Sequence, residues 1–154
     1  MNDRTATNLT AEDRLDILDL CARYYISTDE KDVDAFMDCW VPDDDIVFKS
    51  AFGDFAGRAA VRHFEDEHVH RGMAVGKRHI LSNVSIRPAP APDQALVTTY
   101  LTVLEVVEEP RIIATAIYRD SVAEKTSAGW RFRERVMDVD PGFQKAMAAR
   151  PERG

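Results

Sequence analysis

Apolar residues in the first third of the chain recur at helical spacing. Thr10 can cap a helix, because a threonine side chain accepts a hydrogen bond from a free N–H group of the first turn. Beyond it, apolar positions return every three or four residues as far as Tyr25, which predicts one long helix ending near residues 28–30. A second, short helix is predicted to begin near Asp32 and to stop before Pro42, since the residue before a proline disfavours helical geometry.

The second half of the chain alternates instead. A short strand is predicted at 46–48, a turn at 52–55 leads into another short strand, and a third helix follows over about 59–68. Four longer strands are then predicted at 78–86, 95–107, 111–122 and 130–139, with a loose helix at 143–149. Helices that are separated in sequence from an antiparallel meander indicate an α+β fold and not a doubly wound sheet. The length predicts a single domain over residues 1–154, with its core at about 11–140 and flexible ends.

Composition and charge narrow the class of protein. The chain is 45% hydrophobic and 31% charged, which is typical of a folded globular protein, and its net charge of −7 argues against a nucleic-acid partner. No apolar run approaches the roughly 18 residues of a membrane span, and no secretory signal is evident, so we expect a cytoplasmic protein without membrane contact. Cys21 and Cys39 are expected to be buried free thiols, since their spacing fits no zinc motif.

Two residues stand out as candidates for chemistry. Asp29 ends the first predicted helix and His79 begins the first long strand, so only the fold can bring them together. An imidazole accepts protons well near neutral pH, and a carboxylate bonded to its other nitrogen fixes the tautomer. The alternative is that Asp29 is a turn residue and His79 a half-buried side chain without a chemical role.

Several short segments, in this order, carry a resemblance to a known family. They are Arg23-Tyr24-Tyr25 followed by Asp29, then Gly57-Arg58-Ala59-Ala60-Val61, Lys77-Arg78-His79-Ile80-Leu81-Ser82-Asn83-Val84, Tyr118-Arg119-Asp120 and Gly129-Trp130-Arg131-Phe132. Over roughly residues 11–138 the chain resembles the SnoaL-like branch of the nuclear-transport-factor-like superfamily, also called the cystatin-like α+β cone. The resemblance implies a cone-shaped, curved antiparallel sheet and three N-terminal helices that enclose an apolar pocket.

The resemblance also implies a function. Scytalone dehydratase, bile-acid 7α-dehydratase and hexachlorocyclohexane dehydrochlorinase share an aspartate just after the first helix and a histidine base on the first long strand. Asp29 and His79 stand at the matching places, and Tyr24 matches a tyrosine of the bile-acid enzyme. We therefore expect a cofactor-independent lyase or isomerase, dehydratase-like, acting on a small, apolar, cyclic molecule. The alternatives are a non-catalytic small-molecule-binding module and a small subunit resembling those of ring-hydroxylating dioxygenases.

Further residues are candidates for contact with the substrate. They are Asn83, Trp40, Phe48, Phe55, Tyr100 and Arg135. The aromatic members can equally be plain core residues. Arg135 is the nearest counterpart of an arginine that the related enzymes use, although it alternates with Arg131 and Arg133 on a face that is most often solvated.

Strand alternation suggests an assembly. If His79 faces the pocket, then Ile80, Val84 and Ile86 face outward, and we expect a second copy to cover them in a homo-oligomer, either dimer or trimer.

Neither a metal nor a cofactor is expected. His63, Glu67 and His70 are spaced as one helix face could present metal ligands, but a polar surface stripe explains the spacing equally well. The chain also has no glycine-rich phosphate loop.

Overall fold

The structure, a computed structural model, describes residues 8–70 and 76–148. Its helices are α1 (Ala11–Glu30), α2 (Val33–Met37), α3 (Arg58–His70) and α4 (Pro141–Ala148). Its strands are β1 (Val47–Ser50), β2 (Gly53–Ala56), β3 (Lys77–Pro88), β4 (Gln94–Glu105), β5 (Arg111–Thr126) and β6 (Gly129–Val139). The predicted elements are all present, with β5 four residues longer at its end than the alternation indicated. The ends that the sequence predicts to be flexible, 1–7 and 149–154, lie outside the described residues.

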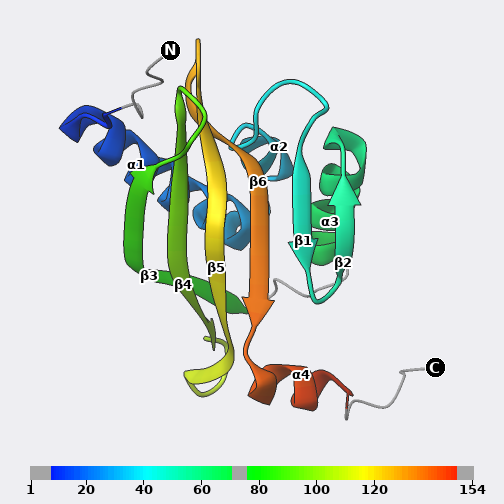
Figure 1. The fold of residues 1–154 in the computed structure, drawn as a ribbon. Helices are drawn as coiled ribbons and strands as arrows, with labels where there is room; N and C mark the ends of the chain where they lie inside the picture. The colour runs from blue at the N-terminus through cyan, green and yellow to red at the C-terminus, as the bar shows by residue number, and fades with distance from the viewer. Residues whose placement is uncertain (1–7, 71–75, 149–154) are drawn as a thin grey trace.

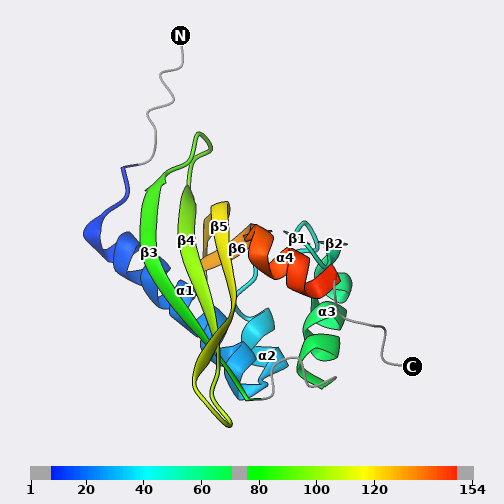
Figure 2. The same ribbon diagram turned by 90° about the horizontal axis from the view of Figure 1, so that it is seen from below.

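The strands form one curved, six-stranded sheet in the order β2-β1-β6-β5-β4-β3 (Figure 1). The meander from β3 to β6 is antiparallel, as predicted. The β1–β2 hairpin joins it through a parallel pairing of β1 with β6, which the sequence did not indicate. Figures 1 and 2 show α1, α2 and α3 on one side of the sheet, with α4 beyond the end of β6. The fold is therefore α+β, with helices that cover one face of a curved sheet.

The start of α1 is held by a capping box. The Asp13 N–H donates to Thr10 Oγ1 at 3.1 Å, and the Thr10 N–H donates to Asp13 Oδ2 at 3.0 Å. Asp13 also accepts hydrogen bonds from Lys125 Nζ at 2.7 Å and Trp130 Nε1 at 3.0 Å. These donors, Lys125 above all, hold the pKa of Asp13 well below its usual value. At the other end, Lys31 adopts a left-handed φ of 62°, which stops the helix directly after Asp29 and Glu30.

A bulge in β3 reverses the predicted sides of that strand. Its register with β4 shifts between Ser82 and Ser85, and Asn83 has a φ of 52°. One extra residue in a strand turns every later side chain to the other face. Ile80 does point outward, with 43% of its surface exposed, but Val84 and Ile86 pack against the core. The prediction that these three residues share an outer face is therefore wrong.

A second irregularity separates the arginines of β6. Phe132 pairs with Ala123 and Glu134 with Val122, so that Arg133 is the extra residue and the alternation reverses there. Arg135 consequently points inward and is 1% exposed. The prediction of one solvated arginine face is wrong for this residue.

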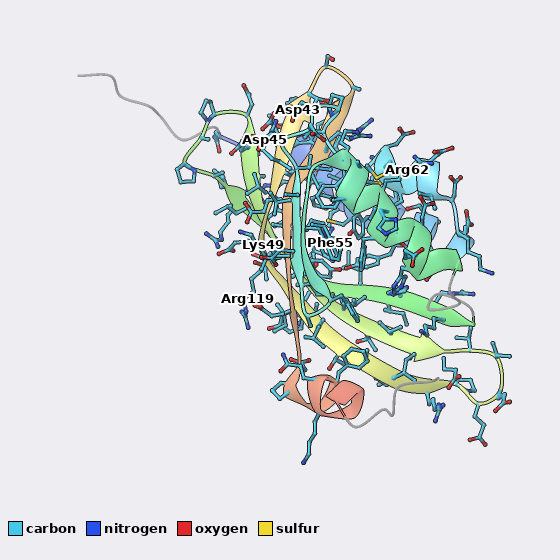
Figure 3. All side chains as sticks on the ribbon, turned by 90° about the vertical axis from the view of Figure 1, so that its right-hand side faces the viewer. Asp43, Asp45, Lys49, Phe55, Arg62 and Arg119 are labelled. Carbon is cyan, nitrogen blue, oxygen red and sulfur yellow. The ribbon has the colours of Figure 1, made fainter. Side chains whose placement is uncertain are left out.

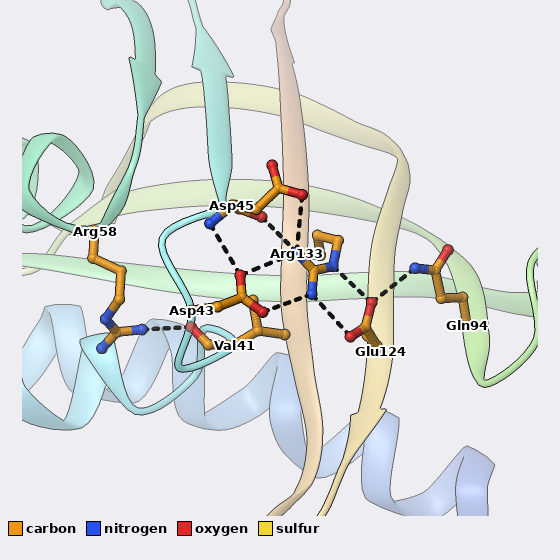
Figure 4. A network of polar contacts seen from close by, with 7 residues as sticks. All are labelled: Val41, Asp43, Asp45, Arg58, Gln94, Glu124 and Arg133. Carbon is orange, nitrogen blue, oxygen red and sulfur yellow. Dashed lines mark hydrogen bonds and ion pairs between the residues drawn. The ribbon is translucent and has the colours of Figure 1, made fainter.

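Arg133 instead organises the outer side of the sheet (Figure 4). Its guanidinium donates to both oxygens of Glu124, at 2.6 and 2.9 Å, and to Asp43 Oδ2 at 3.0 Å. It also donates to the Asp45 carbonyl at 2.8 Å. This network ties the loop before β1 to β5 and β6. The acidic run at 43–45 forms the predicted bends, and Arg133 neutralises part of its charge.

The β1–β2 hairpin packs on α3 through aromatic rings. Phe55 lies on the helix side of the hairpin, whereas Lys49 lies on the opposite side (Figure 3). The Phe55 ring centroid is 4.7 Å from that of Phe64 and 6.1 Å from that of Phe48. Cys21 and Cys39 are buried free thiols, as expected. No helix within the described residues is long and apolar enough to cross a membrane.

Candidate active site

A cavity lies between the helices and the concave face of the sheet. Its volume is about 100 Å³, compared with about 10–15 Å³ for one water molecule by the same measure. Side chains from α1, α2, α3, α4, the β1–β2 hairpin, β3, β4, β5 and β6 contribute to its wall, which is mostly apolar. The polar exceptions are Tyr24, Tyr25, Thr28, Glu65, His68, Lys77, His79, Thr115 and Tyr118. A small apolar molecule with a few oxygen atoms fits such a lining.

Asp29 and His79 meet at this cavity. The distance from His79 Nδ1 to Asp29 Oδ1 is 2.7 Å, and the His79 backbone N–H donates to Asp29 Oδ2 at 3.0 Å. Their side chains are 13% and 9% exposed. A carboxylate can only accept, so this contact assigns the hydrogen of a neutral imidazole to Nδ1 and leaves the lone pair on Nε2. The predicted contact across 50 residues of sequence is thus present in the structure.

Local structure fixes both members of this pair. Asp29 lies in the last turn of α1, and α1 packs along β3. His79 is the third residue of β3, and its ring stacks on the Tyr25 ring at a centroid distance of 5.5 Å and an angle of 15°. The His79 imidazole is therefore held by a carboxylate at one nitrogen and by the face of the Tyr25 ring, and these two contacts restrict its rotation.

Three tyrosines form the inner wall around a buried arginine. The Arg135 guanidinium carbon lies 4.2 Å from the ring centre of Tyr24 and 4.0 Å from that of Tyr118. Arg135 Nη2 donates to Tyr25 Oη at 3.4 Å, whereas Nε and Nη1 have no hydrogen-bond partner among the described residues. Burial raises the pKa of all three tyrosines, and the Arg135 charge opposes that shift. Arg135 itself does not line the cavity, and its charge contacts the faces of the tyrosine rings that do.

The helix α3 contributes two titratable groups that the sequence reasoning missed. Glu65 is 2% exposed, and burial raises its pKa to about 7. His68 stacks on Phe64, and burial, with His79 next, lowers its pKa to about 4. The signal was available, because Val61, Phe64, Glu65 and His68 follow the spacing of a buried helical stripe.

Of the other predicted contact residues, only Phe48 lines the cavity. Phe55 packs against Phe48 behind that wall, and Trp40 is 2% exposed in the core without reaching the cavity. Asn83 and Tyr100 are exposed, Asn83 at the bulge and Tyr100 on the outer face of β4. Neither Asn83 nor Tyr100 lines this cavity, because the bulge and the strand alternation turn them away from it.

The weak metal-like set is only partly visible. His63 and Glu67 lie on α3, but the side chain of His70 is outside the described part of the chain. Within that part, no group of three or more histidine, cysteine, aspartate or glutamate side chains is arranged to hold a metal ion.

Residues 9–136 match the family described as the SnoaL-like domain. The chain belongs to this family. No curated protein sequence matches the chain at a significant level.

Solved structures agree with this assignment. A protein of unknown function with a cystatin-like fold from Nostoc punctiforme PCC 73102 shares 28% identity with a TM-score of 0.75, over 88% of this chain and 96% of that one. An NTF2-like protein from Novosphingobium aromaticivorans shares 29% identity with a TM-score of 0.73, over 89% and 88%. LinA shares 16% identity with a TM-score of 0.66, over 84% and 86%, and this similarity establishes the fold alone.

Proposed function

We propose that this SnoaL-like domain is a cofactor-independent lyase or isomerase of the dehydratase type, acting on a small, apolar, cyclic molecule. The observation that carries the proposal is the Asp29–His79 pair at the wall of an apolar cavity. A carboxylate and an imidazole are costly to remove from water, and purely structural packing gains little from them. They are useful there as an oriented base.

In this proposal His79 Nε2 removes a proton from a carbon next to a carbonyl group. Asp29 holds Nδ1–H and stabilises the imidazolium that forms. Tyr24 donates a hydrogen bond to a substrate oxygen, where negative charge develops as the C–H bond breaks. Arg135, behind the Tyr24 ring at 4.2 Å, favours that charge electrostatically without touching the substrate. Water then leaves, or the double bond shifts.

Dehydration of 3-hydroxy-1-tetralone tests the proposal. This bicyclic β-hydroxy ketone loses water to give fluorescent 1-naphthol, so turnover is read directly. His79→Ala should reduce turnover by about 10²-fold or more, since general base catalysis contributes at least that much. Asp29→Asn should reduce it by at least about tenfold through the wrong tautomer, while binding of 1-naphthol changes little.

The same assay separates an enzyme from a carrier. Wild-type protein that binds 1-naphthol but does not accelerate dehydration would favour the non-catalytic binding module. Full activity of His79→Ala would refute the catalytic role of the histidine. His63→Ala, on the same helix as His68 but exposed and outside the cavity, is the matched control for losing a histidine.

We also propose that the protein is a homo-oligomer, a dimer or trimer, which uses the outer face of the sheet. Ile80, Tyr100 and Ile112 project from three adjacent strands and are 43%, 44% and 65% exposed. An apolar surface across several strands favours association. Light scattering should give more than a monomer mass, and Ile80→Arg should lower it. Leu15→Arg, at an apolar position of α1 that is 66% exposed, is the control.

A further inference from the structure

Glu65 is a buried carboxyl group at the cavity wall that the base mechanism leaves unused. Its residue is 2% exposed, it lines the cavity, and Oε1 has no hydrogen-bond partner among the described residues. No basic side chain forms a salt bridge with it in that part of the chain. An isolated buried carboxylate is costly, so the environment favours the neutral acid.

Two contacts place Glu65 near the Asp29–His79 pair. The Thr28 side chain is near enough to its carboxyl group to lower the pKa of Glu65, and Thr28 directly precedes Asp29 on α1. Glu65 also lies one helical turn before His68, whose ring centroid is 6.4 Å from that of His79. The α3 face of the cavity therefore stands close to the base.

The Thr28 contact is compatible with a protonated Glu65. Thr28 Oγ1 donates its one hydrogen to the Tyr24 carbonyl at 3.3 Å, so its oxygen is free to accept. A neutral Glu65 can fill that acceptor, and both bonds then form together. If Glu65 ionises, the Thr28 hydroxyl can turn and donate to it instead, which is why this contact alone would lower the Glu65 pKa.

Six other titratable groups face the cavity. They are Tyr24 and Tyr25 from α1, His68 from α3, Lys77 and His79 from β3 and Tyr118 from β5. Burial outweighs the Thr28 hydrogen bond, and the nearby Asp66 charge acts in the same direction as burial. The same cavity thus holds Glu65, whose surroundings favour the protonated acid, and His79, the proposed base, so that the roles of acid and base fall to two different residues.

We propose that Glu65 is the general acid of this site, which protonates the departing hydroxyl group; this role rests on the proposed dehydratase function. His79 takes the proton from carbon, and the C–H electron pair becomes the new C=C bond. As the C–O bond breaks, the Glu65 O–H bond breaks too, and its proton completes the water that leaves. The imidazolium then returns its proton to the Glu65 carboxylate through solvent, so the site is restored and atoms balance.

Two ketones distinguish the acid from the base. In heavy water, 1-tetralone reports proton removal alone, because it has the α C–H bond but no leaving hydroxyl group, whereas 3-hydroxy-1-tetralone needs both steps. Glu65→Gln should slow dehydration by about 10²-fold or more and leave deuterium exchange within a few-fold of wild type. His79→Ala should slow both. Glu67→Gln, on the same helix but outside the cavity lining, is the control and should slow neither.

Infrared spectroscopy reads the proton without any substrate. The C=O stretch of a neutral carboxylic acid should be present in wild type at pH values between 4.5 and about 7, and should be missing in Glu65→Gln but not in Glu67→Gln. Absence of that band from wild type would overturn the acid role. So would equal loss of exchange and dehydration in Glu65→Gln, or full dehydration activity there. Wild type that catalyses neither reaction would overturn the proposed function and the acid role with it.

Discussion

The burial of Glu65 predicts a specific dependence of protein stability on pH. The ordinary glutamate pKa of 4.5 applies to the unfolded chain, and burial raises the folded-state pKa to about 7. Between these values the unfolded chain has released the proton while the folded protein retains it, so the free energy of unfolding falls as pH rises. Each pH unit between the two pKa values lowers the free energy of unfolding by about 1.4 kcal/mol, so the total loss is on the order of 3 kcal/mol and is complete above about pH 7.

Glu65→Gln removes this loss, because an amide has no proton to release. The free energy of unfolding of wild type and of Glu65→Gln is measured with urea at a series of pH values. After the difference between the two proteins at pH 4.5 is subtracted, the variant should be more stable than wild type by about 3 kcal/mol above pH 7. Glu67→Gln reports what removal of any glutamate from this helix does. Parallel curves for wild type and Glu65→Gln would refute the argument, since they would mean that Glu65 ionises in the folded protein as it does in the unfolded chain.

Three further predictions concern the scaffold. Arg133→Met should lower the free energy of unfolding by about 1–2 kcal/mol, because it removes the cation that pairs with both Glu124 and Asp43, whereas Lys49→Met should cost less than about 0.5 kcal/mol for its single exposed pair. Equal effects in urea unfolding would contradict this. Thr10→Ala should cost about 1 kcal/mol through the lost helix cap, and an unchanged unfolding midpoint would argue against the capping box. Cys21 and Cys39, whose pKa burial raises to about 11, should react with iodoacetamide only after unfolding; mass spectrometry showing modification of the native protein would contradict their burial.

The fold and the central pair were accessible from sequence for physical reasons. Helical spacing up to Tyr25 and period-two alternation after residue 77 are long, strong patterns, so the element types and their order follow directly. The Asp29–His79 contact spans 50 residues and came from the family resemblance, because no local pattern links a helix end to a particular strand position.

The side of the sheet that each strand residue faces was harder to predict from the sequence, because the alternation of sides fails wherever a bulge adds a residue. The bulge at Asn83 moved Val84 and Ile86 into the core, and the irregularity at Arg133 turned Arg135 inward. Asparagine tolerates left-handed backbone better than most residues, so Asn83 was a hint, but many asparagines in strands are regular. A register is set by pairing with the neighbouring strand, which the sequence of one strand does not contain.

Glu65 was missed for a different reason. Charged residues are assumed to face water, and the set His63, Glu67 and His70 drew attention to the polar face of α3. Glu65 lies instead in the stripe with Val61 and Phe64, where a charge is unexpected. A charged residue within an apolar helical stripe is itself a sign of a functional group, and it can be read without a structure.

The measurement that tests the central claim most directly is deuterium exchange at the α-carbon of 1-tetralone in heavy water, followed by NMR. It isolates removal of a proton from carbon, which is the step assigned to the Asp29–His79 pair. Exchange should be accelerated by wild-type protein, reduced by at least about tenfold in Asp29→Asn and reduced by about 10²-fold or more in His79→Ala. Exchange in His79→Ala at the wild-type rate would contradict the claim that this imidazole is the base.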